Sequence, residues 1–232
     1  AAGRELNVSP SAVSRLVRLL EERLGVRLFR RLPNGLALSE RGAAYLAEVT
    51  AAFVEGGHET CAHGHRWAHQ MGMSEERERE FIRAAADSIQ KTTGTRPVGW
   101  LSRYLHTADT RRILAEEGFR YHMDDFSCDL PFFDASVTPR MVVLPYALDS
   151  NDMKMWNAPA FMPRDWLAYC KDSFDWLHAE ALQQGPRMMS VGVHLRIIGR
   201  PGRIGAYEEF LRYAAATRHV WIATRREIAE HF

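Results

Sequence analysis

Residues 6–42 read LNVSPSAVSRLVRLLEERLGVRLFRRLPNGLALSERG, and this stretch predicts a helix followed by a hairpin. Ala1–Asn7 is short and compatible with a helix. Val8-Ser9-Pro10 then favours a helix start, because serine can bond free backbone amides and proline suits the first helical position. Apolar residues recur three and four positions apart, which indicates one buried stripe, and Gly25 is expected to end the helix. The stripe consists of Val13, Leu16, Val17, Leu20 and Leu24.

Two short alternating stretches, Val26–Arg31 and Leu36–Leu38, are joined through Pro33-Asn34-Gly35. Asn-Gly is the commonest residue pair in tight hairpin turns. The sequence therefore predicts a two-stranded wing directly after the helix.

Taken together, the helix restart, the wing and the Asn-Gly turn of residues 6–42 resemble the DNA-binding domain of the LysR-type transcriptional regulators, over roughly residues 1–50. The resemblance implies that Ser9–Arg23 is a recognition helix entering the major groove of double-stranded DNA, with the wing near phosphate. A merely solvated Ser/Arg-rich helix face is the alternative. Such regulators begin with another helix, so the start of this domain is expected to lie before Ala1. The implied DNA contacts are Ser11, Ser14, Arg15, Arg18, Arg30 and Arg31.

The charge of the chain is divided unevenly. Residues 1–50 hold 8 Arg against 5 Glu, a net charge of +3, whereas residues 51–232 hold 22 Lys and Arg against 24 Asp and Glu, a net charge of −2. Basic character confined to the N-terminal part agrees with a surface that faces phosphate.

Three widely spaced cysteines indicate neither a disulfide framework nor a zinc knuckle. The sequence also contains no run of about 18 apolar residues and no signal-peptide pattern. We therefore expect a soluble, cytoplasmic protein without a membrane partner.

Ser39 can cap a helix that continues through Phe53 toward Gly56-Gly57, so the two parts of the chain meet inside a helix without a linker. The predicted domains are a truncated winged segment, residues 1–50, and a second domain, residues 51–232. The same joint is also compatible with an accidental fusion of reading frames.

Beyond Gly57, short apolar runs alternate with long helical ones, which indicates an α/β fold. Strands are predicted at His58–His63, Val98–Trp100, Arg120–Met123, Met141–Pro145, Met188–His194 and Val220–Ala223. Helices are predicted at Ser74–Thr93, Asp109–Glu117, Arg164–Gln184 and Ile204–Thr217. Ser74 is expected to cap the first of these helices, and Gly94 is expected to end it.

Five blocks of residues 51–232 resemble, in order, the polysaccharide deacetylase superfamily, and within it the allantoinase-like branch. The blocks are GHETCAHGHRW (57–67), TGTRPVGW (93–100), GFRYHMDDFSCDLPFF (118–133), VVLPYALDSNDM (142–153) and MMSVGVHLRIIGRPGRIGA (188–206). The resemblance implies an incomplete (β/α) barrel that lacks its first strands and a hydrolase of non-peptide carbon-nitrogen bonds, linked to carbohydrate metabolism. Open barrel edges at the first and last predicted strands are expected to cause self-association.

Catalytic residues are also implied by this resemblance. His194 occupies the position of the general acid, a task that suits an imidazole. His63 takes the first place of a His-[Ser/Thr]-x-x-His metal motif, whose second place is Trp67, so that ligand is lost and no cofactor is expected. Zinc held by His63 and His65 is the alternative. Asp129 is the candidate base, with Asp124 and Asp125 as alternatives.

Four further residues are candidates for substrate binding. Trp67 and Trp100 could line a pocket, although aromatic residues at such spacing also form cores. Arg103 and Arg196 could bind a carboxylate or ureido oxygen through guanidinium donors, or lie at surface turns.

These observations support a hydrolase of a small amide or ureide, fused to a DNA-binding segment. The alternatives are a transcription regulator whose barrel senses a small molecule without turnover, and a non-functional hybrid. The first predicts ureide turnover, the second predicts salt-sensitive duplex binding, and the third predicts neither.

Overall fold

The computed structural model describes residues 10–33 and 35–232. It consists of two compact units: the first runs to Arg120 and includes Val137–Pro139, and the second comprises Tyr121–Ser136 and Arg140–Phe232. The sequence-based domain boundary at residue 50 lies within the first unit and stays a prediction.

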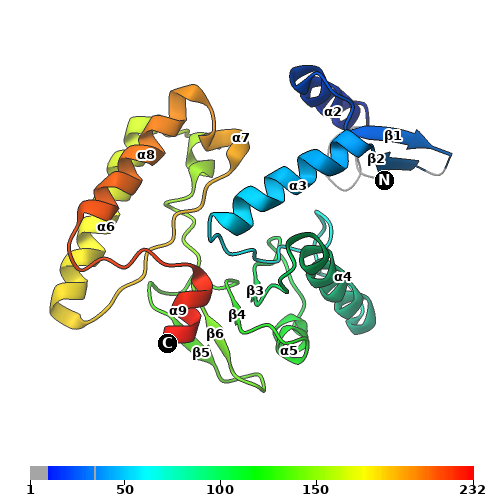
Figure 1. Cartoon of the computed structure of the whole chain (residues 1–232). Coiled ribbons are helices and arrows are strands. Elements are labelled where there is room, and N and C mark those ends of the chain that lie inside the picture. The colour runs from blue at the N-terminus through cyan, green and yellow to red at the C-terminus, as the bar shows by residue number, and fades with distance from the viewer. Residues whose placement is uncertain (1–9, 34) are drawn as a thin grey trace. The chain divides into compact units, whose positions relative to one another are not determined.

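The first unit begins with helix α2 (Pro10–Leu24), strands β1 (Phe29–Leu32) and β2 (Gly35–Leu38), and helix α3 (Glu40–Glu55), as Figure 1 shows. This order confirms the predicted helix and wing. Gly25 follows the helix with φ +67°, a left-handed conformation that favours glycine. β1 and β2 are antiparallel, and Leu32 faces Gly35, so Gly35 belongs to the strand. Two predictions cannot be compared with the structure: the short helix at Ala1–Asn7 and the tight turn at Asn34 lie outside the described residues.

A single carboxylate fastens α2 to the wing. Glu21 Oε1 accepts hydrogen bonds from the backbone N–H groups of Leu28 at 2.8 Å and Phe29 at 3.1 Å, while Oε2 accepts one from Arg27 at 2.9 Å. The backbone hydrogen bond from Phe29 is the main reason that the pKa of Glu21 lies below its ordinary value. A Cβ at Gly42 would lie 2.0 Å from the Leu28 carbonyl oxygen, so α3 can approach the wing only through glycine.

The apolar stripe predicted on α2 is not buried as expected. Val17 is half-buried, but Leu20 and Leu24 are 39% and 38% exposed. Glu21, one turn after Val17 on the same face of the helix, is buried and bonded to the wing. The side chains of Val13 and Leu16 lie outside the described residues.

Helix α3 passes residue 50 without a break, and the Ser39 side chain caps it by accepting a hydrogen bond from the Gly42 N–H, as predicted. The first unit continues with α4 (Glu75–Thr93), β3 (Gly99–Trp100) and α5 (Thr110–Glu116). Ser74 caps α4 through the Arg77 N–H, and Gly94 ends it with φ +78°, both as expected.

The second unit combines a small mixed sheet with a helical layer. In the sheet, β6 (Met141–Val143) pairs in parallel with β4 (Tyr121–His122) and antiparallel with β5 (Phe132–Asp134). The helical layer packs α6 against α8 around an apolar core that includes Trp166 and Phe210 (Figure 1). Its elements are the 3-10 helix η1 (Asp152–Met155), α6 (Pro163–Gln184), α7 (Leu195–Ile198) and α8 (Pro201–Ala216). The last helix, α9 (Arg225–His231), lies beside the sheet, and Phe232 after it packs against Phe133 of β5 (Figure 1).

Three predicted strands do not form. His58–His63 contributes only a single bridge, between Ala62 and Trp100, and Met188–His194 and Val220–Ala223 are irregular. The backbone near Met188 is held by isolated bonds, such as Met188 N–H to the Asp129 carbonyl at 3.0 Å, rather than by a strand ladder. The expectation of self-association was tied to strand edges at the first and last of these segments, so it stays a prediction without that support.

Candidate active site

A histidine and an aspartate that are 42 residues apart in the chain meet in the second unit. Asp152 Oδ1 lies 2.7 Å from His194 Nδ1, and Asp152 Oδ2 accepts a 2.7 Å hydrogen bond from the His194 backbone N–H. The Asp152 side chain is fully buried, whereas 28% of the His194 side chain is exposed. Because a carboxylate only accepts hydrogen bonds, Nδ1 carries the proton of this bond and Nε2 is the ring nitrogen available for chemistry.

The loop around Asp152 leaves little freedom to the carboxylate. Asn151 caps η1 by accepting a 2.8 Å hydrogen bond from Met153 N–H, and Asp152 N–H donates to the Gly192 carbonyl at 2.9 Å. A Cβ at Gly192 would lie 2.2 Å from Tyr146 Oη and 2.4 Å from Asn151 Nδ2. A side chain at position 192 would therefore displace the hydrogen-bonded side chains of Tyr146 and Asn151.

Buried hydrogen bonds connect the two site loops to the core. The Ser150 hydroxyl donates to the Ser190 carbonyl at 2.5 Å, and the indole N–H of Trp166 donates to the Ser150 carbonyl at 3.1 Å. Trp166 belongs to α6 and is fully buried. The segments that carry Asp152 and His194 are thus fixed to the same helix.

The structure corrects the placement of His194 and adds a residue to the site. The sequence predicts His194 at the end of a buried strand, but it immediately precedes α7 at the end of an irregular segment. Sequence reasoning did not select Asp152. Its signal is the polar run Asp149-Ser150-Asn151-Asp152, which follows the apolar Met141–Pro145. Asp129, the candidate base, is exposed in the same unit.

Three of the predicted residues gather in the first unit. His63 Nδ1 lies 2.6 Å from the Leu101 carbonyl oxygen, and the His63 ring meets Trp67 edge-on at 5.4 Å between centroids. The Arg103 guanidinium lies 4.4 Å from the centroid of the Trp67 ring and donates to the Trp67 carbonyl at 2.8 Å. A cation–π contact of this kind fixes a guanidinium at a surface.

Trp100 is a correction. It is fully buried, its indole N–H donates to the Ser102 hydroxyl at 2.9 Å, and its ring packs against Phe119 at 5.5 Å. A side chain with no exposed surface is a core residue, the alternative that the sequence left open. Arg196 is exposed on α7, two positions after His194.

The two histidines considered as zinc ligands, His63 and His65, are both exposed. Within residues 10–33 and 35–232, no three His, Cys, Asp or Glu side chains are placed so that they could hold a metal ion. Two imidazoles alone are a poor fit to a zinc site, which takes three or four protein ligands.

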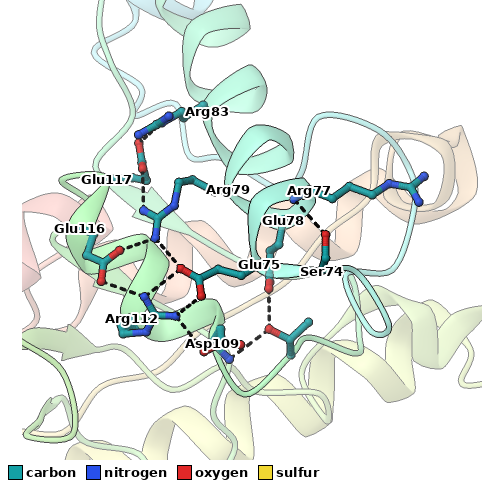
Figure 2. A network of polar contacts seen from close by, with 11 residues as sticks. Ser74, Glu75, Arg77, Glu78, Arg79, Arg83, Asp109, Arg112, Glu116 and Glu117 are labelled. Atoms are coloured by element: carbon teal, nitrogen blue, oxygen red, sulfur yellow. Dashed lines mark hydrogen bonds and ion pairs between the residues drawn. The ribbon is translucent and has the colours of Figure 1, made fainter.

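A larger charged cluster joins α4 to α5, as Figure 2 shows. Arg79 bonds Glu75 at 3.0 Å, Glu116 at 2.5 Å and Glu117 at 3.0 Å, while Arg112 bonds Glu75 at 2.9 Å. Each cation of the cluster is matched by carboxylates, so these contacts connect the helices.

Two family models match the chain. The lysR family of bacterial regulatory helix-turn-helix proteins matches residues 1–43, and the polysaccharide deacetylase family matches residues 36–122. The chain joins a lysR-type helix-turn-helix segment to a polysaccharide deacetylase segment. The two matches overlap at residues 36–43, in β2 and the start of α3, which lies before the boundary predicted at residue 50.

In individual relatives, the similarity to deacetylases extends to the part of the chain that contains the Asp152–His194 pair. A protein of Schizosaccharomyces pombe described as a polysaccharide deacetylase is 31% identical over 200 residues, which is 78% of this chain and 62% of the relative. A crystal structure described as a polysaccharide deacetylase from Pseudomonas aeruginosa PAO1 is 41% identical, with a TM-score of 0.75, over 82% of this chain and 64% of that one. The structure of Puue Allantoinase is 39% identical, with a TM-score of 0.74, over 82% and 63%.

The chain therefore spans less than two thirds of the length of these relatives. Their likeness confirms the deacetylase-type α/β fold of the second segment and supports the allantoinase-like branch.

The lysR-type segment exposes most of the residues that the sequence assigns to DNA. Ser14, Arg15 and Arg18 are exposed on α2, and Arg30 and Arg31 are exposed on β1. Arg18 also lies 3.4 Å from Glu22 one helical turn later, an exposed pair that phosphate could replace. The side chain of Ser11 lies outside the described residues.

No helix among the described residues is long and apolar enough to cross a membrane.

Proposed function

We propose that the deacetylase segment hydrolyses a non-peptide carbon-nitrogen bond in a small amide or cyclic ureide. The observation that carries the proposal is the Asp152–His194 pair, in which a buried carboxylate fixes Nδ1 of a half-exposed imidazole. This arrangement orients a histidine, as acid–base catalysis requires.

In the proposed reaction, water adds to the carbonyl carbon and forms a tetrahedral intermediate. The carbon-nitrogen bond then breaks while Nε2–H of His194 gives its proton to the leaving nitrogen, and Asp152 keeps the imidazole in place through Nδ1–H. An open-chain amide gives an acid and an amine, whereas a cyclic ureide opens to a ureido acid. Asp129 remains the sequence-based candidate for the base that takes a proton from the water. His63 remains a sequence-based candidate for a catalytic residue.

Zinc stays outside these steps, because His63 and His65 provide only two ligands. A metal requirement is nevertheless testable. If chelation abolishes turnover and zinc restores it, a site that includes His63 and His65 gains support, and the metal-free form of the proposal is wrong.

The test is hydrolysis of allantoin, hydantoin and small acetylated amines, followed by NMR before and after chelation. We expect turnover without added metal, and a decrease in kcat of about two to four orders of magnitude for His194→Ala, the usual contribution of a general acid. His231→Ala is the matched control, because His231 is an exposed histidine of the same unit. Absence of turnover on all three substrate types would overturn the proposal, and equal kcat in His194→Ala would remove His194 from it.

A second candidate function, binding of double-stranded DNA, is favoured by the exposed arginines of α2 and the wing. Four phosphate contacts by Arg15, Arg18, Arg30 and Arg31 predict a log-log dependence of affinity on salt with a slope of about −3.6. Each arginine-to-alanine variant should flatten the slope by about 1. Binding to random duplex is measured between 50 and 200 mM salt, a range over which a slope of about −3.6 corresponds to a loss of affinity of roughly 150-fold. A flat dependence contradicts the regulator function, and failure of both assays favours the hybrid alternative.

The cytoplasm is the compartment that we propose for either activity, because a lysR-type segment needs access to DNA. Self-association, the remaining partner prediction, is checked by light scattering of the purified chain.

A further inference from the structure

The second unit contains a hollow of about 360 Å³ next to the loop that carries Asp152. Its size falls in the range of small-molecule sites. Its lining includes Phe126, Cys128, Asp129, Tyr146, Leu148 and Asp149. Two lining residues connect the hollow to the Asp152–His194 pair. Tyr146 is hydrogen-bonded to Asn151, the neighbour of Asp152, and Lys154 lies on η1, which begins with Asp152.

Tyr146 lines this hollow and carries a hydroxyl that can donate a hydrogen bond. Its hydroxyl oxygen accepts a 2.7 Å hydrogen bond from Asn151 Nδ2, so the hydroxyl proton points elsewhere. The side chain is half-buried, and burial is the main cause that raises the pKa of Tyr146 above its ordinary value. The phenol therefore stays protonated at neutral pH and can donate to a carbonyl oxygen.

Asp129 supplies a hydrogen-bond acceptor on the same hollow. It is exposed, in contrast to Asp152, and its carboxylate can accept from an N–H group. The second carboxylate of the lining, Asp149, is already engaged, because Tyr169 donates to it at 2.7 Å. Phe126 and Leu148 add exposed apolar surface, 62% and 58% respectively.

The lining also includes Lys154, Ser127 and Ser190. Within it, the pairing of the Tyr146 hydroxyl, a donor, with the Asp129 carboxylate, an acceptor, matches the chemistry of an amide, which accepts at its carbonyl oxygen and donates at its N–H. We propose that this hollow binds the amide or ureide group of the ligand, with the Tyr146 hydroxyl donating to the carbonyl oxygen and Asp129 accepting from the N–H. The ligand class rests on the proposed hydrolase function, but occupation of the hollow can be measured without turnover.

The modification rates of the three cysteines show whether a ligand occupies the hollow. Cys128 lines it and is exposed, whereas Cys61 belongs to the first unit and serves as an internal reference. Cys170 is buried in the core, where burial raises the pKa of its thiol to about 12, so it reports unfolding. Methyl methanethiosulfonate, a small reagent without an amide group, modifies exposed thiols, and mass spectrometry follows each cysteine separately.

Hydantoin is the probe, and its integrity is checked by NMR in the same tube. We expect it to slow modification of Cys128 while leaving Cys61 unchanged and Cys170 unmodified. Tyr146→Phe keeps the ring and removes the donor, so the hydantoin concentration for half protection should rise about three- to tenfold, the effect of one hydrogen bond. Asp129→Ala should raise it similarly. Tyr213→Phe is the matched control, because it removes a hydroxyl bonded to Asp175 on the helical layer.

Absence of Cys128 protection, or equal protection in wild type and Tyr146→Phe, overturns the assignment of the hollow. The two proposals fail separately. Turnover without Cys128 protection keeps the hydrolase and removes this site, whereas protection without turnover keeps the site and removes the hydrolase.

Discussion

The charged cluster between α4 and α5 and the Asp152–His194 pair use charge in opposite ways. In the cluster, Arg112 bonds Glu75, Asp109 and Glu116 at 2.9–3.0 Å, and its side chain is 40% exposed. Exposed ion pairs of this kind are screened by water and contribute little each. In the pair, both oxygens of one fully buried carboxylate, that of Asp152, accept hydrogen bonds from a single histidine, His194. The number of charged contacts is therefore not what singles out the proposed site; the distinguishing feature is one partly exposed imidazole held by a buried carboxylate.

The first way to break this comparison is Asp152→Asn. An asparagine keeps the shape but has one acceptor oxygen, so it cannot accept from both the backbone N–H and Nδ1–H of His194. We expect kcat to fall about ten- to a hundredfold, since a hydrogen bond to a charged group contributes about 1.5–3 kcal/mol. The ¹⁵N chemical shifts of the His194 ring should show that Nδ1 no longer holds its proton as in the wild type.

The matched control for Asp152→Asn is Asp175→Asn, which changes a carboxylate on α6 that accepts from Tyr213 at 2.6 Å. It should leave kcat and the ring shifts unchanged. A variant Asp152→Asn with normal kcat and an unaltered ring tautomer would show that the buried carboxylate only stabilises the loop.

Local patterns predicted the parts of the fold that depend on neighbours in the chain. The caps Ser39 and Ser74 and the stops Gly25 and Gly94 are confirmed, because capping depends on a few consecutive residues. The apolar run Met188–His194 was a poor guide, because an irregular segment fixed by hydrogen bonds to distant loops has the same composition as a buried strand.

The candidate site was predicted in part for the same reason. Resemblance to a family pointed to His194, but Asp152 lies 42 positions earlier in the chain, and no periodic signal links the two residues. Trp100 shows the converse limit. An aromatic residue near a predicted strand end fits a pocket or a core, and only its complete burial distinguishes the two.

The smallest expected effect comes from the cluster itself, through Arg112→Ala. A hydrogen bond from Arg112 is the main cause that lowers the pKa of Glu75, and one from Arg79 is the main cause for Glu116. A lowered pKa in the folded state stabilises the fold above the ordinary carboxyl value of 4.5, and this contribution is lost as the pH falls through the lower folded value. Arg112→Ala should therefore lower the melting temperature at neutral pH by at most about 2–4 °C. Calorimetry at neutral and acidic pH checks whether the difference in melting temperature from the wild type shrinks in acid and in high salt. The control is Arg212→Ala, which breaks an isolated ion pair with Glu208. If Arg112→Ala lowers the melting temperature strongly and does so in acid as well, the cluster stabilises the fold through packing and not through charge. The cluster and the Asp152–His194 pair would then differ only in how deeply their side chains are buried.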